Sequence, residues 1–210
     1  MTSVYNSLLN YDVNKKLTSI TFSNCKLTDD DITHISNYIV ASTILLSCDI
    51  SQNILSPKSC SQFGYCIPKS SSLETLKMSY CGINPESLLF LFNAKGSKCL
   101  KNIVLNGNGF GDIGLVSVSA FIKNSPLLEK IELKRCNGTD MGFITIVNSI
   151  KNLQNNNLKY INYQENNITQ ITLGILKGSN EAFKNKGLIF ALNQIPGETE
   201  KTNIDCAVFA

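Results

Sequence analysis

Hydrophobic residues return along this chain with a period close to 28 residues. From Leu100, apolar or amide residues fall at offsets of zero, three, five, eight and ten, and the same series begins again at Leu128. Six such units start at Leu17, Leu45, Leu73, Leu100, Leu128 and Leu158, which makes successive units 28, 28, 27, 28 and 30 residues long. A fixed period of this length is typical of a repeat architecture.

Each unit predicts one strand followed by one helix. Offsets three and five are apolar, as Ile103 and Leu105 are, and they alternate with other residues as in a strand that is buried on one face. Residue types that favour helix N-caps stand at offset eleven: Thr28, Ser56, Asn84, Gly111, Thr139 and Thr169. Apolar residues at helical spacing follow them, as in Ile32, Ile35 and Ile39, so a helix packs on each strand.

The residue at offset eight alternates strictly between a thiol and an amide: Cys25, Asn53, Cys81, Asn108, Cys136 and Asn166. An Asn there can form hydrogen bonds with the backbone of the tight turn on both sides. A Cys fills the same place as a compact apolar group. We interpret the alternation as packing and not as a metal or redox array, because the eight cysteines contain no CxxC pair.

Strand, turn and long helix in units of about 28 residues, with Cys and Asn alternating at one position, resemble the ribonuclease-inhibitor-like class of leucine-rich repeats over residues 17–195. The resemblance implies an α/β solenoid, a horseshoe with a parallel sheet on its concave side and helices on its convex side. About seven strands are expected, the last at residues 188–192. The class includes ribonuclease inhibitors, the activating protein for the GTPase Ran, tropomodulin-like and CARMIL-like actin regulators, and sensors of innate immunity. All of them bind another protein.

The two ends of the chain are expected to cover the solenoid. Residues 1–16 have apolar positions at helical spacing and are interpreted as an N-terminal cap. The strand at 188–192 is apolar without alternation, so it needs cover on both faces. The tail at 196–210 ends in an apolar segment and is interpreted as a C-terminal cap. Alternatively, the chain is the front part of a longer repeat protein, or a partner occupies that strand.

The second unit is the weakest, and a shorter or distorted helix is expected there. Gly64, Pro68 and a serine run interrupt the residues that would form it. Only Cys60, Phe63 and Ile67 are left to pack on the sheet.

Composition narrows the function classes. The chain has 210 residues and a formal net charge of +3, with basic residues scattered along it, so neither a nucleic-acid partner nor a membrane surface is expected. The N-terminus lacks the basic start and apolar core of a signal peptide, and no apolar stretch reaches the length of a membrane span. We expect a soluble cytoplasmic monomer with reduced cysteines.

Catalytic chemistry finds little support. His34 is the sole histidine, so no Ser/His/Asp or Cys/His set can be completed. The segment from Gly107 to Gly111 reads GNGFG but lacks the GK[ST] ending of a phosphate-binding loop. We expect no enzyme activity, no cofactor and no metal.

The exposed face of the predicted sheet offers a candidate binding surface. Its first half carries short, uncharged side chains, whereas its second half is longer and charged, with Lys130, Lys134 and Arg135 expected along one strand. Binding energy concentrates in large side chains that lose water on contact. The expected contact residues are Lys77, Tyr80, Lys130, Glu132, Lys134, Arg135 and Tyr160. The alternative is a merely solvated sheet face.

The predicted function is therefore a protein–protein interaction module, a non-catalytic cytoplasmic scaffold or regulator whose partner is another protein. By resemblance, the alternative is a regulator of a small GTPase or of actin.

Overall fold

The computed structural model describes residues 17–92, 95–151, 153, 157–193 and 207–209. In this part of the chain, eight parallel strands form one sheet in the order of the sequence. The strands are β1 (Ser19–Thr21), β2 (Ser47–Asp49), β3 (Thr75–Lys77), β4 (Asn102–Val104), β5 (Lys130–Glu132), β6 (Tyr160–Asn162), β7 (Ile189–Leu192) and β8 (Ala207–Phe209).

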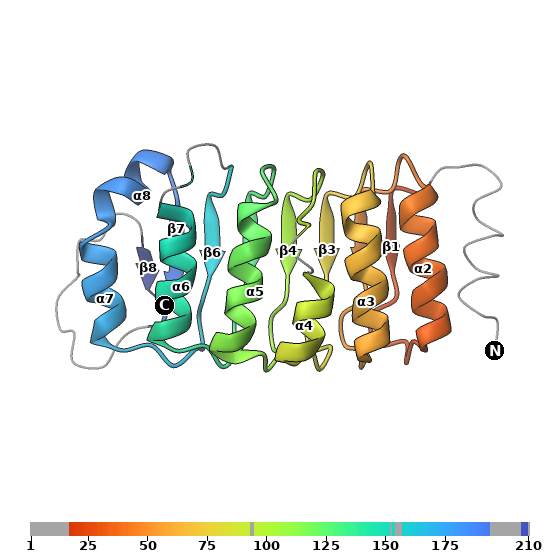
Figure 1. Cartoon of the computed structure of the whole chain (residues 1–210), viewed down its shortest axis with the longest axis horizontal. Coiled ribbons are helices and arrows are strands. Elements are labelled where there is room, and N and C mark those ends of the chain that lie inside the picture. The colour runs from red at the N-terminus through yellow and green to blue at the C-terminus, as the bar shows by residue number, and fades with distance from the viewer. Residues whose placement is uncertain (1–16, 93–94, 152, 154–156, 194–206, 210) are drawn as a thin grey trace.

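One layer of helices lies along one face of this sheet (Figure 1). The helices are α2 (Asp29–Ala41), α3 (Pro57–Cys66), α4 (Pro85–Leu91), α5 (Gly111–Lys123), α6 (Asp140–Lys151), α7 (Gln170–Lys177) and α8 (Asn180–Lys186), with a 3-10 turn, η1 (Ile67–Lys69), after α3. Neighbouring strands lie about 4.8 Å apart, whereas packed helices need about 8–10 Å. The stack therefore curves with the sheet on its inner side.

The strand register follows the sequence repeat. Cys48 pairs with Ile20 on one side and Leu76 on the other, and Ile103 pairs with Ile131, so residues at the same offset form rows across the sheet. This arrangement confirms the α/β leucine-rich-repeat solenoid. The sheet has one strand more than the seven expected, because β8 pairs in parallel with β7.

The core lies between the sheet and the helices. Ile103, Ile131 and Ile161 from the strands are fully buried, as are Leu115 and Val118 from α5. Each such side chain contributes roughly 1.5–3 kcal/mol when it is removed from water. Toward the C-terminal end the core becomes aromatic, where the ring of Phe143 packs against those of Tyr163 and Phe190.

The alternating amides and thiols connect neighbouring repeats. Oδ1 of Asn108 accepts hydrogen bonds from the backbone N–H groups of Cys81 and Ile83 at 3.0 and 3.1 Å, and its Nδ2 donates to the carbonyls of Met78 and Leu105, both at 2.8 Å. Asn53 and Asn166 form equivalent bonds with the turns that contain Cys25 and Cys136. The expectation that each Asn pairs the turn backbone on both sides is confirmed.

The cysteines do more than fill space. The thiol of Cys81 donates to the carbonyl of Ile50 in the preceding repeat at 3.5 Å, and that of Cys136 donates to Leu105 at 3.4 Å. Burial raises the pKa of Cys136 to about 12, so this thiol stays protonated and can donate. Thiol and amide turns thus bind their neighbours by two different sets of bonds.

A carboxylate in the first turn of three helices holds the start of the next helix. Asp112 in α5 accepts from the N–H and hydroxyl of Thr139 at 2.7 and 2.6 Å and from the N–H of Gly142 at 3.1 Å. Asp140 accepts an equivalent set of bonds from Thr169 and Thr172 at the start of α7. Asp29 accepts only from the hydroxyls of Ser56 and Ser59 at the start of α3. The expected N-caps bond as predicted at Thr28, Ser56, Asn84 and Thr169, whereas Gly111 is the first residue of α5 and not its cap.

The expectation of a shorter or distorted second helix is confirmed, because α3 is shorter than α2 and α5, which have 13 residues each, and it continues into the 3-10 turn η1. α3 has 10 residues, and Pro68 lies in η1, where the chain has already left the α-helix. α4 in the third repeat is shorter, with seven residues. α4 ends at Leu91, and the ring of its C-cap residue, Phe92, stacks on Phe121 with centroids 4.1 Å apart.

We predict that Asn108→Ala lowers the free energy of unfolding by about 3 kcal/mol, because four buried backbone groups lose their partner. Urea denaturation followed by circular dichroism measures the change. Asn102→Ala is the matched control, since Asn102 is half-buried and its amide donates only to Thr75 at 3.3 Å. Equal stability losses in the two variants would contradict the structural role of the Asn.

The tail that supplies β8 allows a second prediction. Residues 196–206 and 210 lie outside the described residues, as do residues 1–16, so the proposed caps remain predictions. Deleting residues 203–210 removes the strand paired with β7 and exposes the edge of a strand whose Phe190 and Leu192 are fully buried. We expect aggregation or a melting temperature several degrees lower. A truncated chain that stays monomeric and equally stable would contradict a capping role.

Candidate protein-binding surface

The face of the sheet opposite the helices carries the sequence-predicted site residues. In each of the strands β1 to β6 the central residue points to the core, so its two neighbours lie on the open face. On β1 and β2 three of the four outward residues are Ser or Thr; on β5 and β6 the four are Lys130, Glu132, Tyr160 and Asn162. The open face therefore changes from small to large side chains along the solenoid.

A first cluster lies on β5 and β6. Nζ of Lys130 is 2.7 Å from Oε1 of Glu132 and 5.0 Å from the ring centroid of Tyr160. Oε2 of Glu132 accepts from the amides of Asn106 at 3.3 Å and Asn162 at 3.0 Å. Burial raises the pKa of Glu132, but the bonds from Lys130, Asn106 and Asn162 outweigh it, so the pKa lies below its usual value. Glu132 is thus held as a carboxylate.

A second cluster lies in the turns that follow the strands. Nζ of Lys134 is 2.7 Å from Oε1 of Glu165, and the guanidinium of Arg135 contacts the other oxygen of the same carboxylate. Glu165 raises the pKa of the Arg135 guanidinium most, and Tyr80 lies close enough to raise it further. The ring of Tyr80 lies against Gly107, where an added Cβ would come within 2.3 Å of the ring. Gly107 is therefore required at this point for close approach.

The backbone of these turns explains where the side chains sit. The residue at offset seven is left-handed in all six repeats, with φ between 54° and 70° at Asn24, Gln52, Tyr80, Gly107, Arg135 and Glu165. This conformation ends the strand and turns the chain toward the helix. Lys134 and Arg135 therefore lie in a turn and not along strand β5, which corrects the expectation from the sequence.

Lys77 stands apart from both clusters. It is paired in register with Val104, which is paired with Glu132, so Lys77 lies two strands away from the first cluster. Its Nζ is 3.9 Å from a carboxylate oxygen of Asp49 on β2. The seven predicted residues thus form two groups and one separate cation.

Three further residues belong to these clusters: Glu165, Asn106 and Asn162. Sequence reasoning missed them because it selected residues by size and charge along single strands. An alignment of the repeats would have identified two of them, because Glu165 shares offset seven with Arg135 and Asn162 shares offset four with Glu132. Residues at equal offsets are neighbours across the sheet.

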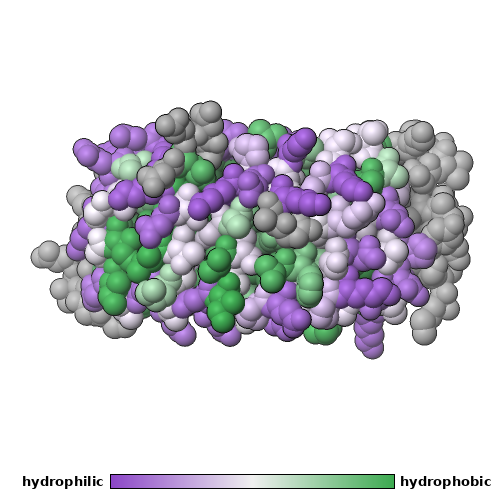
Figure 2. Space-filling model, in the orientation of Figure 1, coloured by the Kyte–Doolittle hydropathy of each residue, from purple (hydrophilic) through white to green (hydrophobic). Residues whose placement is uncertain are grey.

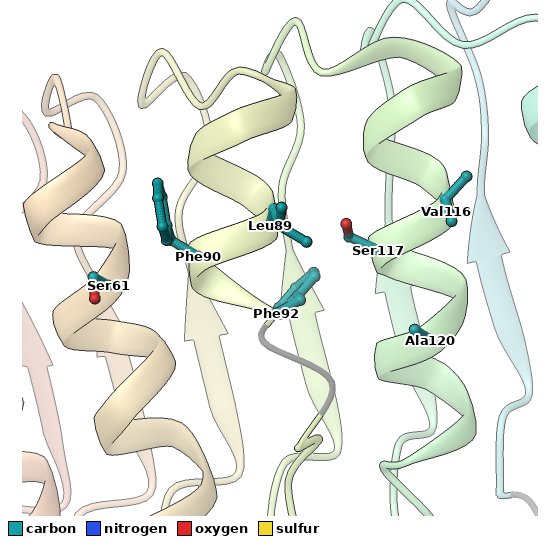
Figure 3. Close-up of a pocket in the computed structure, with 7 residues that line it drawn as sticks. All are labelled: Ser61, Leu89, Phe90, Phe92, Val116, Ser117 and Ala120. Atoms are coloured by element: carbon teal, nitrogen blue, oxygen red, sulfur yellow. The ribbon is translucent and has the colours of Figure 1, made fainter.

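The helix side carries exposed apolar side chains on α4 and α5 (Figure 2). A hollow of about 500 Å³ opens beside the short α4, between α3 and α5 (Figure 3). It is lined by Ser61, Leu89, Phe90, Phe92, Val116, Ser117 and Ala120. The two hydroxyls are its only side-chain polar groups, so it lacks the convergent polar contacts that orient a small ligand.

The described residues contain neither a cluster of metal ligands nor a membrane-spanning helix. No three or more His, Cys, Asp or Glu side chains of this part of the chain gather so that they could hold a metal ion. None of its helices combines the length and the apolar character needed to cross a membrane.

We predict a pH-dependent contribution from Glu132. Because its folded-state pKa is lowered, its stabilising effect is fully present above the unfolded value near 4.3 and is lost as the pH falls through the folded value. Glu132→Gln should therefore lower the unfolding free energy by about 1–2 kcal/mol at pH 7 and by much less near pH 3. Urea titrations at both pH values measure this, with exposed Glu129→Gln as control. A loss that does not depend on pH would contradict it.

No protein-family model and no curated protein matches this chain. Among solved structures, it is similar to the one described as "Leiomodin-1 Actin-Binding Site 2 (ABS2)", with a TM-score of 0.58 and 11% sequence identity. The similarity covers 70% of this chain and 88% of that one. At this identity the likeness concerns the fold alone, and it agrees with the leucine-rich-repeat solenoid of parallel strands and helices described above.

Proposed function

We propose that this chain is a non-catalytic protein-binding module, and that it binds its partner on the open sheet face between β3 and β6 together with the turns that follow these strands. The observation that carries the proposal is the concentration of large, charged and aromatic side chains on that part of a periodic scaffold. The equivalent positions on β1 and β2 carry mostly Ser and Thr, so the fold itself does not need large residues there.

The clusters have the composition of an interface. Tyr and Arg dominate binding energy at protein interfaces, and here Tyr80 is 47% exposed while the side chain of Arg135 is 59% exposed. The close contact with Gly107 holds the ring of Tyr80 in place before a partner arrives. A side chain that is already ordered loses less conformational entropy on binding.

The role we propose is that of a cytoplasmic scaffold or regulator that acts as a monomer. Regulation of actin is a second candidate, favoured by the likeness to an actin-binding domain of leiomodin-1. Regulation of a small GTPase is a further candidate, which rests on the resemblance of the repeats to that class.

Capture from an extract of the source cells tests the proposal. The variant Lys130→Glu/Lys134→Glu should lose the proteins that the unchanged chain retains, as identified by mass spectrometry. The variant Lys58→Glu/Lys123→Glu changes the net charge equally on the helix side and should retain them. The helix-side variant should keep its melting temperature within a few degrees, because surface changes usually alter stability by about 0.5 kcal/mol. Circular dichroism must show that the Lys130→Glu/Lys134→Glu variant is folded at the capture temperature, because Lys130 pairs with Glu132. Retention of all captured proteins by the Lys130→Glu/Lys134→Glu variant would contradict binding on the open face.

Cosedimentation with filamentous actin tests the second candidate with the same pair of variants. Absence of the chain from the actin pellet would remove the actin candidate and leave the general proposal in place.

A further inference from the structure

The charges of the second cluster are not required by the turn that carries them. The two residues at offsets six and seven are Ser23–Asn24, Ser51–Gln52, Ser79–Tyr80, Asn106–Gly107, Lys134–Arg135 and Gln164–Glu165. All six turns have the same left-handed residue, yet only the fifth and sixth are charged. Lys134, Arg135 and Glu165 are therefore additions to a turn that forms without them.

These three residues leave positive charge unbalanced. Both cations face a single carboxylate, and β3 to β6 with their following turns hold four cations, Lys77, Lys130, Lys134 and Arg135, but only two carboxylates, Glu132 and Glu165. The side chains of Lys134 and Glu165 are 37% and 38% exposed. Exposed ion pairs contribute only about 0–1 kcal/mol, so a competing anion can displace such a pair.

We propose that the partner presents an acidic protein segment, one of whose carboxylates replaces Glu165 as the acceptor for Lys134 and Arg135. This inference rests on the proposed function and specifies the chemistry of its partner. The planar guanidinium of Arg135 suits a carboxylate, which it can bind through two parallel N–H groups. Tyr80 lies beside Arg135 and supplies a rigid aromatic surface at the edge of the site.

The distribution of charge favours an acidic protein segment over nucleic acid. A nucleic-acid groove needs cations spaced along the path of the backbone. On the open face toward β1, the cation Lys77 is already next to Asp49, and the outward residues of β1 are Ser19 and Thr21. The positive charge is therefore local, and it fits one or two carboxylates of a short segment.

A defined probe tests this directly. The probe is a short fluorescent peptide that alternates Glu and Gly, and its counterpart has Gln in place of Glu. At low ionic strength, where exposed charges are least screened, fluorescence anisotropy should detect the Glu peptide and not the Gln peptide. Glu165→Gln should raise the affinity for the Glu peptide at least about threefold, because Lys134 and Arg135 lose their internal acceptor. Lys134→Gln/Arg135→Gln should lower it about tenfold.

The chain contains a matched control. Lys101 and Glu74 form another pair with the same 2.7 Å separation and the same exposed fractions, 37% and 38%, between repeats three and four. Glu74 and Lys101 lie just before β3 and β4, at the N-terminal ends of these strands, whereas the turns of the second cluster follow the C-terminal ends of the strands. Glu74→Gln removes the same charge as Glu165→Gln, so a general gain in net positive charge affects both variants equally. We expect no rise in affinity beyond this general effect for Glu74→Gln.

The outcomes separate the inference from the proposed function. Equal affinities in the Glu165→Gln and Glu74→Gln variants would overturn the inference, as would equal binding of the Glu peptide and a single-stranded oligonucleotide. If Lys134→Gln/Arg135→Gln still loses the captured cellular proteins in that case, the open face binds a partner of another chemistry. Capture unaffected by Lys130→Glu/Lys134→Glu would overturn the open-face proposal and the inference with it, even if the Glu peptide binds at this cluster.

Discussion

The structure depends on pairing the backbone of the turn that follows each strand. These turns are enclosed between neighbouring repeats, and an unpaired amide or carbonyl group there costs about 1–3 kcal/mol. Asn108 provides two acceptor and two donor bonds at one such junction. Because the requirement recurs at the same offset in every repeat, it also keeps the strands in register. The rows of core residues follow from that register.

The same constraint leaves nearby positions free to vary. The residue before the Asn or Cys must be left-handed, but its side chain points away from the buried bonds, so Tyr80, Arg135 and Glu165 can all occupy it. Gly107 is the exception in this row, since the ring of Tyr80 occupies the space of its missing side chain. The scaffold thus separates residues that build the solenoid from residues that give its surface chemical character.

The parts of the fold that repeat could be predicted from the sequence, and the parts that break the repeat could not. The strands, the Asn bonds and most N-caps depend on local patterns that recur, and averaging over six units makes them clear. The helix is shortest in two units, with seven residues in α4 and eight in α7, and β8 comes from a segment without the repeat pattern. The ion pairs of Glu165 depend on which side chains meet across repeats. Predicting these ion pairs requires the register between two neighbouring units in addition to the residue pattern within one unit.

Because amide and thiol alternate, the bonds between turns repeat every two units and not every unit. A Cys turn receives the side-chain amide of the next repeat, whereas an Asn turn receives backbone and thiol bonds, as when the N–H of Leu55 donates to the carbonyl of Cys81. Two successive Cys turns would leave the first without its amide. The smallest unit that can be duplicated or deleted without breaking these bonds is therefore a pair of repeats. We expect repeats to have been gained or lost in pairs during evolution.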